Sequence, residues 1–110
     1  MTRQFLHKNL AAGRWFKLSL MEQLGNIGSE VSRARRAQNI NRERFQNAID
    51  RALELFDLTL SDLRWRGRLK EIGRAREVFC DAISGGQEYN SSLIDLEKYF
   101  DQFALAARSL

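Results

Sequence analysis

The sequence predicts an all-α protein, an antiparallel up-down-up-down four-helix bundle preceded by an N-terminal arm. Three observations lead to this prediction. Leu, Ala, Arg and Glu are abundant and proline is absent, which favours helix. Apolar residues recur every three or four positions in four separate segments. The links between those segments are short, which is typical of antiparallel neighbours. The 110 residues fit one domain, so we expect an arm and leading segment at 1–18 and the bundle at 19–110.

The first two helices are predicted over 20–37 and 42–60. Ser19 and Glu22 form a capping-box pattern, in which each side chain bonds the backbone amide of the other residue. Asn41 is a suitable N-cap for the second helix. The apolar stripe of the second helix is broad enough to face two neighbours.

The third helix is predicted over about 63–83, and the fourth runs from the polar segment 90–92 to about 108. Ser61 and Asp62 precede the third, and Trp65 lies near its start. Gly85 suits the left-handed position that often follows a helix. Asn90, Ser91 and Ser92 are residue types that favour a helix start, and the fourth helix is expected to begin there.

Small residues share one face of the first predicted helix, beside its apolar stripe. Each glycine costs about 1 kcal/mol relative to alanine in a helix interior. We therefore interpret this face as a place where a neighbouring helix or a large ring packs closely, with a glycine-lined groove as the alternative. Its residues are Gly25, Gly28, Ser29 and Ser32.

The net charge of +4 comes from the N-terminal segment. Residues 1–21 hold four basic residues and no carboxylate, whereas 22–110 hold 14 of each sign. Within the balanced part, basic residues gather in two places. Most such residues are solvated, but the two clusters are our candidate nucleic-acid or partner contacts. They are Arg33, Arg35, Arg36, Arg42 and Arg44, and then Arg64, Trp65, Arg66 and Arg68.

Familiar catalytic patterns are missing from the sequence. The one histidine, His7, lies in the predicted arm, and Cys80 falls on an apolar stripe. No zinc-ligand spacing, no Glu-x-x-His pair and no phosphate-binding glycine loop is present. We therefore predict a protein that is not an enzyme and needs no metal or cofactor. A divalent ion held by Glu30, Glu54 and Glu77 is the alternative.

Cellular location follows from two simple features. No apolar run approaches the roughly 18–20 residues that a membrane span needs. The single cysteine cannot form an internal disulfide. We therefore expect a cytoplasmic protein.

Four sequence blocks, in order, resemble an uncharacterised family of small bacterial and archaeal proteins. The blocks are "RWFKLSLMEQLGNIGSEVSRA", "AIDRALELFDLTLSD", "RLKEIGRAREVFCD" and "EYNSSLIDLEKYFDQFALAAR". This resemblance implies a helical bundle but no particular activity. Its members begin near Arg14, which implies that 1–13 are a lineage extension or follow a misplaced start codon. In size, basic tail and bundle pattern, the chain is also similar to accessory proteins of diversity-generating retroelements, which form ring-like oligomers and bind a reverse transcriptase and nucleic acid.

The leading functional hypothesis is a non-enzymatic binding or scaffold module. It would act through protein partners and as a homo-oligomer. The alternative is a nucleic-acid-associated accessory protein that binds phosphates through its arginine clusters.

Overall fold

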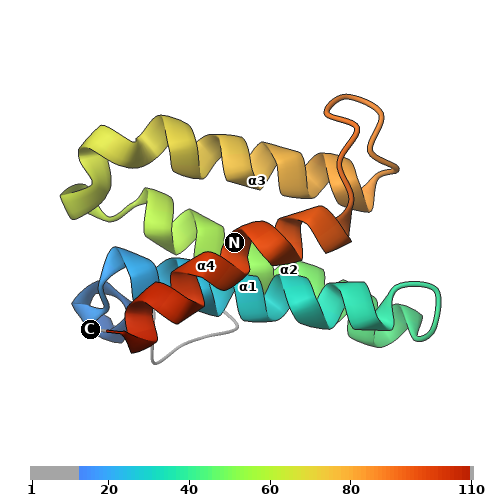
Figure 1. Cartoon of the computed structure of the whole chain (residues 1–110), viewed down its shortest axis with the longest axis horizontal. Helices are drawn as coiled ribbons and strands as arrows, with labels where there is room; N and C mark the ends of the chain where they lie inside the picture. The colour runs from blue at the N-terminus through green and yellow to red at the C-terminus, as the bar shows by residue number, and fades with distance from the viewer. Residues whose placement is uncertain (1–12, 110) are drawn as a thin grey trace, which may run out of the picture.

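The computed structural model describes residues 13–109, which contain four α-helices and two short 3-10 helices (Figure 1). No described residue belongs to a strand, so the predicted all-α class is confirmed for this part of the chain. None of the helices in this range is long and apolar enough to cross a membrane. Residues 1–12 of the predicted arm lie outside the described residues. In chain order the elements are η2 (Trp15–Lys17), α1 (Leu20–Ala37), α2 (Arg42–Leu60), η3 (Leu63–Arg68), α3 (Leu69–Ile83) and α4 (Leu93–Arg108).

Three α-helices begin at side-chain caps, and the sequence indicates two of these caps, Ser19 and Asn41. The backbone N–H of Glu22 donates to Ser19 Oγ over 3.1 Å, and the N–H of Ser19 donates to Glu22 Oε1 over 3.0 Å. The bond from that amide lowers the pKa of the Glu22 carboxyl. Asn41 caps α2 and Ser92 caps α4 in the same manner. Each cap satisfies an amide that has no partner inside the helix, which fixes where the helix starts.

The third predicted helix is wrong in its first part. Residues 63–68 form the 3-10 helix η3, and the α-helix begins only at Leu69. The backbone leaves helical geometry at Trp65, whose φ and ψ are −100° and 22°. The indole N–H of Trp65 donates to Gln23 Oε1 on α1 over 2.8 Å. This bond between distant segments, with the weak helix propensity of Gly67, accounts for the kink.

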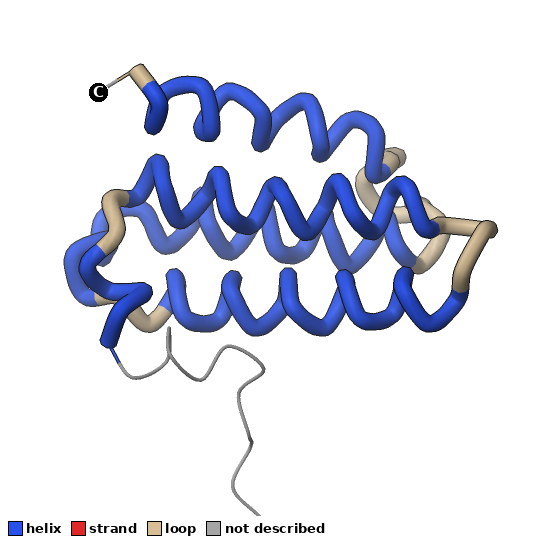
Figure 2. Tube along the Cα trace, turned by 90° about the horizontal axis from the view of Figure 1, so that it is seen from below, coloured by secondary structure: helices blue, strands red, loops and turns tan. Residues whose placement is uncertain are grey.

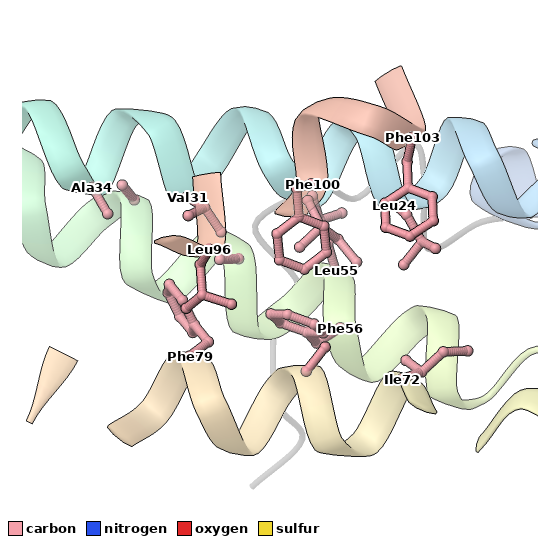
Figure 3. Packing of buried hydrophobic residues seen from close by; sticks show 14 of the residues in the cluster. Leu24, Val31, Ala34, Leu55, Phe56, Ile72, Phe79, Leu96, Phe100 and Phe103 are labelled. Atoms are coloured by element: carbon pink, nitrogen blue, oxygen red, sulfur yellow. The ribbon is translucent and has the colours of Figure 1, made fainter. Parts of the chain in front are cut away.

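The helices pack unequally. Helix α1 lies against both α2 and α4, whereas α3 lies mainly along α2 (Figures 1 and 2). At the centre, the Phe56 ring lies 5.8 Å from the ring of Phe79 and 5.9 Å from that of Phe100, measured between centroids (Figure 3). These three fully buried rings join α2, α3 and α4. Tilted ring pairs of this kind add about 0.5–1.5 kcal/mol each beyond the burial of their area.

The glycine face of α1 lies against α4. A Cβ atom on Gly28 would stand 2.6 Å from Phe100 Cβ, and one on Gly25 would stand 3.2 Å from Ala104 Cα. Ser32 joins the same contact, because its hydroxyl donates to Glu97 of α4 over 2.6 Å. Ser29 is exposed and bonds only the carbonyl of its own helix at Gly25. Side chains larger than hydrogen at positions 25 and 28 would push the two helices apart.

Candidate anion-binding cleft

The last turns of α1 and the first turns of α2 enclose a cleft of about 420 Å³. Positions 44, 47, 48 and 51 follow the three-and-four spacing of one face of α2, and 33, 36 and 37 share a face of α1, with Ile40 in the turn that follows. The buried residues Ala37 and Ala48 contribute short side chains, so the longer groups stand around a hollow. We call it the arginine cleft after Arg33, Arg36, Arg44 and Arg51. The other lining residues are Ala37, Ile40, Asn41, Asn47 and Ala48.

The lining of the arginine cleft carries four positive charges and no carboxylate. Arg33 is held by Glu30, with 2.7 Å between Nη1 and Oε1. Arg36 donates to a backbone carbonyl of its own helix over 3.4 Å. Within residues 13–109, Arg44 and Arg51 form no ion pair. Positive charges that face each other across a concave surface raise the local concentration of anions.

Glu30 holds Arg33 in place at one side of the cleft. This carboxylate is only 5% exposed, and its second oxygen, Oε2, has no hydrogen-bond partner among the described residues. A buried carboxylate needs a cation nearby. Arg33 therefore neutralises a buried carboxylate as well as lining the cleft. Arg44 and Arg51 neutralise no carboxylate among the described residues.

The first predicted arginine cluster is divided by the structure. Arg33, Arg36 and Arg44 line the cleft. Arg35 instead reaches α4, where its Nε lies 2.8 Å from Glu97 Oε2. This bond, with that from Ser32, lowers the pKa of the Glu97 carboxyl. Arg42 lines a separate hollow with Phe45 and Ile83. The sequence reading missed Arg51, although its position seven residues after Arg44 was a usable signal.

The second predicted cluster belongs to η3, at the opposite end of the molecule from the α1–α2 turn (Figure 1). Arg64 Nη2 lies 2.7 Å from Asp62 Oδ2 and also donates to the carbonyl of Leu18 over 2.7 Å. Its guanidinium carbon stands 4.4 Å from the centre of the Trp65 ring. Arg68 pairs with Glu71 over 2.9 Å, and Arg66 is exposed. One face of the Trp65 ring is therefore covered by Arg64.

A buried polar network lies beneath η3, and the sequence reading did not identify it. Gln23 is fully buried; its Nε2 donates to the carbonyl of Trp15 over 3.0 Å and to Asp62 Oδ2 over 3.2 Å. The indole N–H of Trp15 donates to Thr59 over 3.2 Å. The Arg64 guanidinium holds the pKa of the Asp62 carboxyl below its ordinary value. The sequence signal for this network was Gln23, a polar residue three positions after Leu20 and next to Leu24 of the apolar stripe.

The alternative metal site does not assemble. Glu30 and Glu54 are buried, whereas Glu77 is exposed and accepts a bond from the Tyr89 hydroxyl over 3.0 Å. Among residues 13–109, no three His, Cys, Asp or Glu side chains are grouped closely enough to hold a metal ion. Cys80 lies 3.9 Å from a nitrogen of Arg76.

Comparisons with known proteins supply no relative for this chain: no family model, curated protein or solved structure matches it. The family resemblance of its sequence blocks therefore stays a prediction.

Proposed function

We propose that this protein is a non-enzymatic binding module that acts through macromolecular partners in the cytoplasm. We also propose that its helices form an antiparallel up-down-up-down bundle, which the short links at 38–41 and 61–62 favour. The functional proposal rests on a difference between the polar groups at the two ends of the molecule. The buried ones at η3 bond one another, whereas the cleft arginines Arg44 and Arg51 lack carboxylate partners among the described residues. Unneutralised charge at a surface hollow is suited to holding an anionic partner.

The first class of partner is protein, and it includes a second copy of this chain. Ile94 and Leu105 are 53% and 59% exposed on α4. They are eleven residues apart, which returns a helix to the same face after about three turns. Exposed apolar side chains that share a face are favourable at an interface.

Light scattering over a concentration series tests self-association. We expect an oligomer at tens of micromolar, and we expect Ile94→Lys/Leu105→Lys to reduce the measured mass. Leu63→Lys is the control, because Leu63 is 76% exposed but lies on η3. A wild-type protein that is strictly monomeric at these concentrations contradicts the homo-oligomer part of the proposal.

Association with nucleic acid is the second candidate, and the arginine cleft specifically favours it. Phosphate contacts by Arg supply most of the non-specific affinity for nucleic acids, and each contact adds to the salt dependence. Four such contacts on a single strand predict a slope of about −3 for the logarithm of affinity against the logarithm of salt.

Binding of single- and double-stranded oligonucleotides, measured from low to moderate salt, tests this candidate. A steep slope is the expected result, and no binding at low salt rejects the candidate. Deletion of residues 1–13 in parallel separates the contribution of the basic N-terminal segment, which carries Arg3 and Lys8.

A further inference from the structure

The arginine cleft concentrates its charge over a short distance. Arg33 and Arg36 are three residues apart on α1, and Arg44 and Arg51 are seven apart on α2. With a rise of about 1.5 Å per residue, these pairs span about 4.5 Å and about 10 Å along their helices. Four guanidinium groups therefore border one hollow of about 420 Å³. That volume lies within the range of about 300–1,000 Å³ typical of small-ligand sites.

The density of charge favours one kind of anion. In an internal nucleic-acid backbone each phosphate carries one charge, and a sugar separates it from the next. In a condensed phosphate chain a single bridging oxygen separates neighbouring phosphorus atoms. A triphosphate end carries about four negative charges near neutral pH, since its terminal group contributes about two and each inner group one. Four arginines border the cleft, one of them paired with Glu30, and the planar groups of arginines bond phosphate oxygens in pairs.

We propose that the arginine cleft binds a condensed phosphate chain, either as a free oligophosphate or as the 5′-triphosphate end of a nucleic-acid strand. The proposal deepens the nucleic-acid candidate and rests on the same cleft. Arg33, fixed by Glu30, supplies a preorganised wall. Arg44 and Arg51 supply cations that give up no described ion pair when they turn to the ligand. Asn47 adds an exposed amide between them.

Calorimetric titration with inorganic tripolyphosphate at low salt tests the site directly. We expect Arg44→Gln/Arg51→Gln to weaken binding at least tenfold. The matched control is Arg42→Gln/Arg66→Gln, which removes the same total charge outside the cleft and should change affinity less than twofold. Arg33 is left intact because it neutralises buried Glu30. Thermal melting of both variants verifies that the chain remains folded.

Three results overturn the proposal: equal weakening in both double variants, orthophosphate binding as tightly as tripolyphosphate, or no binding of tripolyphosphate. A pair of single-stranded oligonucleotides, identical except for a 5′-triphosphate or a 5′-hydroxyl, separates the two sources of the chain. Stronger binding of the triphosphate oligonucleotide, with competition by tripolyphosphate, supports the strand end as ligand. Tripolyphosphate binding without oligonucleotide binding supports the free oligophosphate and rejects the nucleic-acid candidate. Equal oligonucleotide binding without competition by tripolyphosphate rejects the strand end as the ligand, supports the free oligophosphate, and places nucleic-acid binding outside the cleft.

Discussion

The two arginine-rich ends of the molecule have similar composition but different surroundings. At η3, Arg64 bonds Asp62 and the carbonyl of Leu18 and covers the Trp65 ring. At the α1–α2 turn, Arg44 and Arg51 line an open hollow with no acidic residue in it. At the η3 end, Arg64 stabilises contacts within the chain. At the cleft end, Arg44 and Arg51 remain available to a ligand.

The difference shows that the acceptors near an arginine decide its role, more than the density of arginines along the chain. Asp62 is 6% exposed and lies two residues before Arg64, so a cation beside it is needed for stability. At the cleft end, the buried carboxylate of Glu30 is paired with Arg33. Substitutions at each end, and at the α1–α4 contact between them, test this contrast.

The largest effect is expected from Gly28→Leu, because it disturbs the α1–α4 contact on which both ends depend. The added side chain would enter the space of Phe100, 2.6 Å from the position of a Cβ atom. We expect a loss of about 3 kcal/mol or more in the free energy of unfolding. Gly73→Leu is the control, since a Cβ atom there meets nothing within 4 Å. Chemical denaturation measures both, and equal stability of the two variants would contradict close packing at Gly28.

Asp62→Ala should have the next largest effect. It removes the carboxylate acceptor of Arg64, one acceptor of Gln23 and the cap of η3 together. Loss of buried charge-assisted bonds predicts destabilisation by about 1–3 kcal/mol. The exposed Asp101→Ala serves as the reference. If oligophosphate binding also fell at temperatures where the Asp62 variant is folded, the two ends would not be independent.

Acid should reveal both structural arginine pairs. The Arg64 guanidinium lowers the pKa of the Asp62 carboxyl, and Arg35 does the same for Glu97. Their unfolded pKa values are about 4. These carboxylates therefore contribute stability above that pH, and the contribution is lost as the pH falls through the lower folded values. Melting temperatures from pH 7 to pH 3 should fall less steeply in Asp62→Asn and Glu97→Gln than in wild type. A parallel decline in all three proteins would refute the coupling.

The smallest effect on stability is expected from Arg44→Gln/Arg51→Gln. Neither arginine has an ion pair within the described residues, so the free energy of unfolding should change by no more than about 0.5 kcal/mol. Arg64→Gln, by comparison, leaves Asp62 without its cation and should be clearly destabilising. Denaturation of the two proteins side by side makes the comparison, and similar losses would remove the distinction between the ends.

Local signals accounted for most of what the sequence predicted correctly. The structure starts α1 and α2 at Leu20 and Arg42, as expected, because Ser19 and Asn41 cap amides only three residues away. The first turns of the third helix were wrong because Trp65 bonds Gln23, 42 residues earlier. No window of local sequence contains that contact.

The candidate site was predictable only in part, for the same reason. A run of arginines marked the α1–α2 turn, but the pairing of Arg35 with Glu97 spans 62 residues and removes it from the free set. Arg51 lies outside the run and reaches the cleft through helical periodicity. The role of each arginine therefore depends on how α1 packs against α2 and α4, which the local sequence does not show.

Both tryptophans of the chain bond the same side chain: Gln23 donates to the carbonyl of Trp15 and accepts from the indole of Trp65. Intrinsic tryptophan fluorescence is therefore a local signal from the η3 end. Its emission should shift to longer wavelength when that end opens to water, whereas a ligand that enters the distant arginine cleft should leave the spectrum nearly unchanged. Binding assays for this protein consequently need calorimetry or a labelled ligand, and fluorescence remains free to report folding alone.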